Sequence, residues 1–219
     1  MGVVIRLPRT RYEPDSVDEW GRDAQLIELL TPAVKLRWDV SVGGAQHLPK
    51  RGGALLVTNS RWFSLNTIYT AWALSGTIGR PVRFSGRPDI APLGPLMQRF
   101  GGLLNKPEEI RSALRDGELV VVSARGTRNP RHAGAVDPAL IGTAVSTSTP
   151  VFPVASMSSP IGRAARVEVG AQMRPTRKRR GPLAELELAE VTQRHIQRLL
   201  DGFGGLHTGV APVDWLAEG

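Results

Sequence analysis

The side chains best suited to chemistry stand soon after two short apolar runs. Ser60 and Arg61 follow the first run, Ala-Leu-Leu-Val, and Arg125 and Arg128 follow the second, Leu-Val-Val-Val. Guanidinium groups bind phosphate or sulfate through paired hydrogen bonds, so a cleft that gathers these arginines with Lys106 would bind such an anion. The alternative is that some of the arginines, Arg61 and Arg125 first, point to solvent. Ser60 would act as a nucleophile only beside a base, and none stands near it in the sequence.

The composition is that of a globular protein with a strong positive charge. The 219 residues suit one domain with a sizeable core, and 41% of them are apolar. The chain has no cysteine, which excludes disulfide bonds and thiolate metal sites, and we predict neither a metal nor a cofactor. A net charge of +8 favours anionic partners, either nucleic acid or lipid headgroups, unless it serves solubility alone.

The sequence has no segment typical of secretion or membrane insertion. The N-terminus lacks a basic stretch followed by an apolar one, and no run of about 18 apolar residues occurs. We therefore predict a cytoplasmic protein without a transmembrane helix. Any contact with a membrane is expected to be peripheral.

Strand and helix signals alternate along most of the chain, which is typical of an α/β fold. The expected strands lie at 40–42, 54–57, 81–84, 119–122, 151–154 and 165–169, and the expected helices at 16–31, 65–74, 107–116, 137–145 and 182–203. Ser16 and Glu19 form a capping-box pattern for the first helix, and Pro32 is expected to end it. Pro153 inside its strand predicts an edge strand or a bulge.

The predicted fold is a mixed, mostly parallel central sheet flanked by helices. An N-terminal helix precedes this sheet, and a long C-terminal helix follows it. The expected organisation is an N-terminal arm and helix at 1–35, an α/β domain at 36–204 and a loosely held tail at 205–219.

Four ordered segments are similar to the motifs of one enzyme family. They are 38–59, ending in Thr58-Asn59; 86–106, ending in Asn105-Lys106; 120–128, containing Gly126-Thr127-Arg128; and 149–154, reading Thr-Pro-Val-Phe-Pro-Val. Four motifs in order are more specific than one. The chain therefore resembles the glycerophospholipid acyltransferases of the lysophosphatidate type. The resemblance implies an acyltransferase-like α/β domain, an acyl-CoA donor and a lysophospholipid or related acceptor.

Three positions to which the resemblance assigns chemistry carry unsuitable side chains. The family's first motif has a His that takes the proton of the acceptor hydroxyl, and an Asp five residues later that orients the His. Ser60 and Leu65 stand at those positions, and Arg125 replaces the Glu of the third motif. Loss of a general base typically costs about 10²–10⁴ in rate, so the comparison of motifs implies a scaffold without its catalytic groups.

Some functional positions of the family are retained. The resemblance implies an acceptor-phosphate site, to which Arg61 would add charge, at Lys106, Gly126, Thr127 and Arg128. One histidine, His132, offers an alternative base, because a loop after Arg128 could return it to the site. The plain alternative for His132 is a solvated loop position.

A dense basic segment precedes the C-terminal helix, with cations at Arg174, Arg177, Lys178, Arg179 and Arg180. Such a density of charge is incompatible with a core, so a solvated loop is expected. Near an anionic membrane each cation would contribute about 1 kcal/mol of attraction. Nucleic acid would attract the same charges, but no helix-turn-helix, zinc-finger or RNA-binding signature accompanies them. A membrane surface is the favoured partner, and a solubilising loop is the alternative.

Three functions follow from these observations. The preferred one is an acyltransferase-like protein without catalysis, which binds a phospholipid, lysophospholipid or acyl thioester at the inner membrane face in a regulatory role or with a partner protein. The second is an active, divergent acyltransferase with another base, His132 first. The third is a basic protein that binds nucleic acid or anionic membranes through charge alone.

Overall fold

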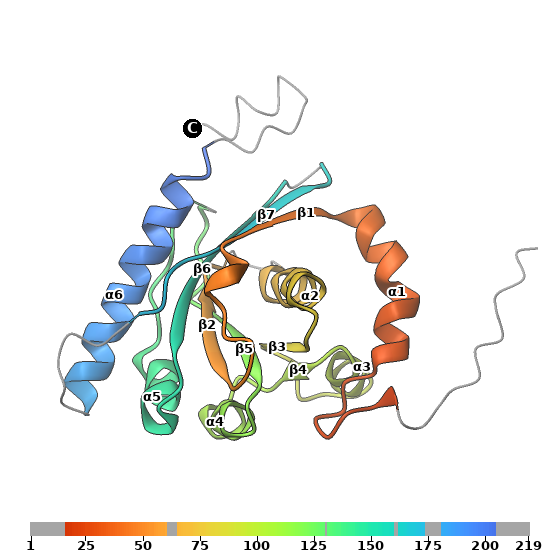
Figure 1. Cartoon of the computed structure of the whole chain (residues 1–219), viewed down its shortest axis with the longest axis horizontal. Helices are drawn as coiled ribbons and strands as arrows, with labels where there is room; N and C mark the ends of the chain where they lie inside the picture. The colour runs from red at the N-terminus through yellow and green to blue at the C-terminus, as the bar shows by residue number, and fades with distance from the viewer. Residues whose placement is uncertain (1–15, 61–64, 130, 160–161, 174–180, 205–219) are drawn as a thin grey trace, which may run out of the picture.

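A mixed sheet runs through the computed structural model, which describes residues 16–60, 65–129, 131–159, 162–173 and 181–204 (Figure 1). Within these residues the strands, in the order in which they lie side by side, are β1 (Asp39–Gly43), β7 (Ala164–Val169), β6 (Val151–Ser158), β2 (Ala54–Thr58), β5 (Leu119–Ser123), β3 (Val82–Ser85) and β4 (Gly102–Leu103). β6 and β7 pair antiparallel, and every other neighbouring pair is parallel. The predicted mixed, mostly parallel sheet is confirmed.

Helices cover both faces of this sheet. They are α1 (Ala24–Arg37) and α2 (Asn66–Ile78) on one side, α4 (Pro107–Arg115), α5 (Pro138–Thr147) and α6 (Pro182–Asp201) on the other, α3 (Leu93–Arg99) beside β4, and the 3-10 helix η2 (Ala45–His47) after β1. Alternate residues of β5 face opposite layers: Val121 packs in the core with α2, whereas Val120 packs in the core with α4, α5 and α6. None of the described helices combines the length and the hydropathy needed to cross a membrane.

The N-terminal helix begins later than its predicted start at Ser16. Asp23 caps α1, because its carboxylate accepts the N–H of Leu26 at 3.0 Å. The preceding residues form a turn instead, in which the Asp18 carboxylate accepts the N–H of Arg22 at 2.9 Å. The predicted cap residue, Ser16, does not cap the helix. Its hydroxyl instead donates a hydrogen bond of 3.3 Å to the carboxylate of Asp23, which does.

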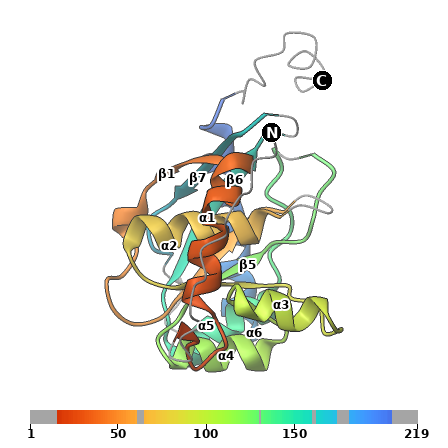
Figure 2. The same ribbon diagram turned by 90° about the vertical axis from the view of Figure 1, so that its right-hand side faces the viewer.

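The same helix continues through Pro32, where the sequence predicted its end, and stops at Arg37. Hydrogen bonds are present on both sides of the proline. The Thr31 hydroxyl donates to the carbonyl of Ile27 at 2.8 Å, and the Trp38 N–H donates to the carbonyl of Val34 at 2.8 Å. α1 crosses the outer side of α2 (Figure 2), where Trp72 of α2 donates to Thr31 at 3.5 Å.

Pro153 lies on an interior strand, so the prediction of an edge position is wrong. β6 pairs with β2 on one side and with β7 on the other. The β7 ladder begins at Val154, immediately after the proline, and the Pro153 carbonyl accepts the N–H of Gly170 at 2.8 Å. Pro153 has no backbone N–H to donate. It is tolerated because the pairing of β6 with β7 begins at the next residue, Val154.

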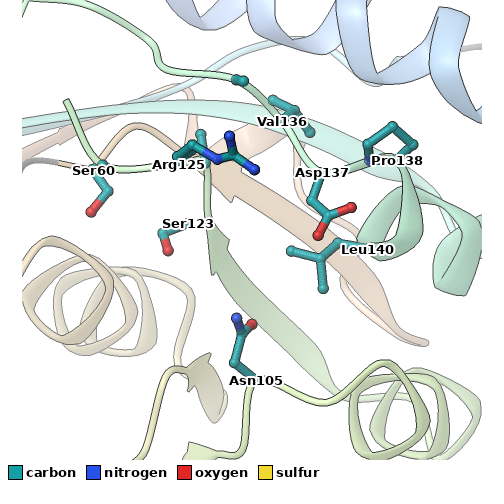
Figure 3. Close-up of a pocket in the computed structure, with 11 residues that line it drawn as sticks. Ser60, Asn105, Ser123, Arg125, Val136, Asp137, Pro138 and Leu140 are labelled. Carbon is teal, nitrogen blue, oxygen red and sulfur yellow. The ribbon is translucent and has the colours of Figure 1, made fainter.

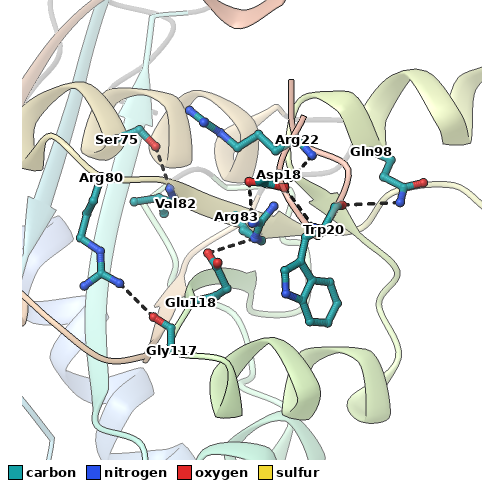
Figure 4. A network of polar contacts seen from close by, with 10 residues as sticks. All are labelled: Asp18, Trp20, Arg22, Ser75, Arg80, Val82, Arg83, Gln98, Gly117 and Glu118. Atoms are coloured by element: carbon teal, nitrogen blue, oxygen red, sulfur yellow. Dashed lines mark hydrogen bonds and ion pairs between the residues drawn. The ribbon is translucent and has the colours of Figure 1, made fainter. Parts of the chain in front are cut away.

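A buried arginine ties the N-terminal turn to the sheet (Figure 4). The Arg83 side chain on β3 is 1% exposed, and one of its terminal nitrogens lies 2.8 Å from the Asp18 carboxylate. Its Nε lies 3.0 Å from the carboxylate of Glu118, which directly precedes β5. The guanidinium also lies over the Trp20 ring, at 5.9 Å from the ring centre. Three segments distant in sequence therefore meet at one buried cation.

Asp23 makes the fold sensitive to acid. Its side chain is fully buried and forms an ion pair of 2.6 Å with Arg99. Burial alone raises the pKa of Asp23, but hydrogen bonds from the Leu26 N–H, Arg99 and Ser16 outweigh burial and hold the pKa below its usual value. The unfolded chain then binds this proton more tightly. The stability contributed by ionised Asp23 is complete above the unfolded pKa of about 3.9 and is lost as the pH falls through the lower, folded pKa.

We expect the free energy of unfolding of the wild type to fall steeply as the pH drops below about 4. Asp23→Asn keeps a good N-cap residue but loses the charge, so it should be less stable at neutral pH and less sensitive to acid. Urea unfolding at a series of pH values measures the stability at neutral pH and its loss in acid. Asp116→Asn, at an exposed position, should retain the wild-type acid dependence. Equal acid dependence in wild type and Asp23→Asn would contradict this assignment.

Candidate functional site

The strands β6, β2, β5, β3 and β4 run in the same direction, so their carboxyl ends lie together at one end of the sheet. A cavity of about 460 Å³ lies there (Figure 3). Thr58 of β2 stands opposite Ser123 of β5, so Ser60 and Arg125 leave neighbouring strands at the same level. The polar side chains of the lining belong to Ser60, Asn105, Ser123, Arg125 and Asp137. The remaining lining residues are small or apolar: Ala124, Gly126, Ala135, Val136, Pro138 and Leu140.

Ser60 is held in place by the residue before it. The Asn59 side chain is buried, accepts the N–H of Ser156 at 2.8 Å and donates to the carbonyl of Ser156 at 2.9 Å, which ties the end of β2 to β6. On the other side, the Ser60 carbonyl accepts the N–H of Thr127 at 3.0 Å. The backbone at Ser60 is thus fixed between β6 and the loop that follows β5.

The loop after β5 is fixed by its own contacts. The Arg125 N–H donates to the carbonyl of Ala135 at 2.8 Å, which closes the loop back on itself. Gly134 has a φ of 73°, and a Cβ there would collide with the carbonyl oxygen of Arg125. Glycine is required at this position on both grounds.

Arg125 is the cation that enters the cavity. Figure 3 shows its side chain extending toward the Asp137 side of the lining. No hydrogen bond or ion pair joins its guanidinium to any residue in the described part of the chain. The Asp137 carboxylate caps α5 by accepting the N–H of Ala139 at 2.9 Å. Among the described lining residues, one positive and one negative group therefore share the cavity without pairing.

Of the other residues of the predicted site that the structure describes, Gly126 alone lines the cavity. The Thr127 hydroxyl donates to the carbonyl of Asn129 at 2.6 Å, which makes it part of the turn. Arg128 is exposed and is absent from the described lining. Leu65 is the N-terminal cap residue of α2, and its side chain is 48% exposed.

Lys106 and His132 also lie outside the described lining. Lys106 directly precedes α4, and its ammonium lies 3.4 Å from the Asp89 carboxylate, with both side chains largely exposed. Its neighbour Asn105 faces the cavity instead. His132 is exposed, and its carbonyl accepts the Thr127 hydroxyl at 3.4 Å. Arg61 and the basic segment of Arg174, Arg177, Lys178, Arg179 and Arg180 fall outside the described residues, as do the predicted arm at 1–15 and tail at 205–219.

Three polar residues of the lining were missed by sequence reasoning. Asp137 was predicted only as a helix cap, and nothing local shows that the start of α5 faces the end of β5. Asn105 was noted only as the residue before Lys106, and the sequence does not show which of these two neighbours faces the cavity. Ser123 stands at the end of its strand, in the same segment as Arg125, and the general rule that sites lie at strand ends would have indicated it.

The chemistry available in the cavity is binding more than proton transfer. Serine hydroxyls and an asparagine amide are not bases near neutral pH, which leaves the Asp137 carboxylate as the one weak base of the described lining. Burial raises the pKa of Tyr69, on the neighbouring helix α2, to about 12, so this phenol stays protonated. The described residues include no group of three or more His, Cys, Asp or Glu side chains arranged to hold a metal ion.

Comparisons with known proteins establish the type of fold. No protein-family model matches the sequence, and no curated protein matches it. Among solved structures, the crystal structure of the 1-acyl-sn-glycerophosphate (LPA) acyltransferase PlsC from Thermotoga maritima is similar, with a TM-score of 0.60. The two sequences are 20% identical, and the match covers 82% of this chain and 79% of that chain. At this identity the likeness shows an acyltransferase-like α/β fold, as predicted, and nothing finer.

Proposed function

We propose that the protein is a non-catalytic relative of the glycerophospholipid acyltransferases that binds a lysophospholipid, phospholipid or acyl thioester. One observation carries this proposal. At the strand ends, where acyl transfer needs a base, the cavity presents Ser60 and Arg125. Within the described lining no histidine is present, and the exposed His132 lies outside it.

Anion binding is the property that the site keeps. Arg125 brings a cation with five N–H donors to the cavity, and Ser60, Ser123 and Asn105 add neutral polar groups. A cavity of about 460 Å³ is within the range of small-molecule sites. The family positions Gly126, Thr127 and Arg128 follow directly, and we propose that they and Lys106 contribute to holding a headgroup phosphate.

The proposed setting is the inner face of a membrane. The net charge of +8 and the basic segment at 174–180 support attraction to an anionic lipid surface. A regulatory role, alone or with a partner protein, is consistent with binding that is not followed by turnover.

Titration with a lysophosphatidate below its micellar concentration tests the proposal. We expect saturable binding, weakened about threefold or more by Arg128→Ala, because an exposed charged contact contributes modestly. Arg115→Ala removes the same charge at an exposed position before β5, at the opposite end of the sheet, and should bind like the wild type. No binding of any lysophospholipid or acyl thioester would overturn the proposal. Equal binding by Arg128→Ala would remove Arg128 from the phosphate site.

The second candidate function is an active, divergent acyltransferase. The observation that favours it is the Asp137 carboxylate in the cavity, which provides a weak base that the sequence did not indicate. Measurable acyl transfer by the wild type that disappears in Asp137→Asn would favour this candidate over binding alone.

A further inference from the structure

Two opposite charges face the same cavity, and each lacks a charged partner there. The Arg125 guanidinium has no hydrogen bond or ion pair with a described residue. The Asp137 carboxylate accepts one backbone N–H, from Ala139, and no cation pairs with it among the described residues. Figure 3 shows the two side chains on the same side of the lining, from the end of β5 and the start of α5.

We propose that this pair of charges selects a zwitterionic headgroup, an aminoalkyl phosphate, whose phosphate binds Arg125 and whose protonated amine binds Asp137. This inference rests on the proposed lipid-binding function and names the class of its ligand. A simple phosphate ester would place its whole negative charge beside Asp137, which is unfavourable. A zwitterion satisfies both groups and adds no net charge to the cavity.

The amine is distinguished from other cations by its hydrogens. A primary ammonium donates hydrogen bonds to a carboxylate, and such charge-assisted bonds are stronger than neutral ones. A trimethylammonium group carries the same charge but has no N–H. The proposed site therefore prefers an ethanolamine type of headgroup over a choline type.

The helix cap alone does not account for the charge at position 137. Asparagine caps helices about as well as aspartate, because either side-chain oxygen accepts the backbone N–H. Asp137→Asn therefore keeps the cap of α5 and removes only the charge. This substitution separates the ligand role from the structural one.

Calorimetric titration of the full chain with lysophospholipids of one short acyl chain tests the inference. The headgroups are ethanolamine phosphate, choline phosphate and a phosphate monoester. We expect the ethanolamine lipid to bind about threefold more tightly than the other two, a modest factor because both side chains are exposed to solvent. Asp137→Asn should abolish this preference, and Arg125→Gln should weaken binding of all three lipids about tenfold. Arg115→Gln and Asp116→Asn, both exposed and before β5, are the matched controls.

The outcomes separate the two proposals. If no lysophospholipid binds, the proposed function fails. If all three bind equally and Asp137→Asn changes nothing, the headgroup inference fails while lipid binding stands. If Arg125→Gln binds like the wild type with an unchanged thermal unfolding midpoint, the phosphate lies elsewhere. Free ethanolamine phosphate that binds as tightly as the lipid would make a soluble ester the ligand, which supports the headgroup chemistry and contradicts a lipid.

Discussion

The triple variant Ser60→His, Leu65→Asp and Arg125→Glu is expected to transfer acyl chains from acyl-CoA to a lysophospholipid at least about 10²-fold faster than the wild type. The physical reason is the return of a general base to the cavity at the end of β2. The backbone at position 60 is already fixed by Asn59, Ser156 and Thr127, so a histidine would start from an ordered position. Product formation measured by chromatography gives the rate.

Position 65 favours this design. Leu65 is the cap residue of α2 and is half exposed, and aspartate is among the best residues for a helix cap. The control is Ser60→His alone, which lacks the carboxylate that orients the ring and should be much slower than the triple variant. A folded triple variant as inactive as the wild type would show that the scaffold itself is not competent for acyl transfer.

Arg83→Met is expected to lower the free energy of unfolding by about 1–3 kcal/mol, because it leaves two carboxylates without the cation that pairs with them. Arg83 is 1% exposed and pairs with Asp18 and Glu118, which are 34% and 21% exposed. The partial exposure of the two carboxylates places the expected loss toward the lower end of that range. Urea unfolding measures it.

The matched control is Arg115→Met, at an exposed position, which should change the free energy of unfolding by less than about 0.5 kcal/mol. The double variant Arg83→Met with Asp18→Asn removes one of the orphaned charges and should recover part of the loss. A single Arg83→Met variant as stable as the control would contradict the view that this cation joins the N-terminal turn to the sheet.

The parts of the fold that were predictable depend on local signals. The all-apolar run before Ser123 indicated a strand buried on both faces, and the structure places β5 between β2 and β3. The proline at 107 and the acids after it indicated the start of α4, which begins at that residue. Such signals act within a few residues of the chain.

The errors arose where distant segments decide the outcome. The start of α1 depends on Asp23, whose carboxylate is held by Arg99, far away in the sequence. The interior position of Pro153 depends on where the β7 ladder begins. In the cavity, Ser60 and Arg125 were predicted from the resemblance of their segments to the motifs of the acyltransferase family. The orientation of Lys106 and the position of Asp137 depend instead on packing between elements.

The most direct test of the central proposal measures binding and turnover in one sample. The wild-type protein is incubated with long-chain acyl-CoA and a panel of lysophospholipids, and bound ligand and acylated product are both quantified. The proposal predicts saturable binding of a lipid or thioester with no product above the protein-free background. Acylated product that grows with protein concentration would contradict it, and its loss in Asp137→Asn or His132→Ala would identify the base.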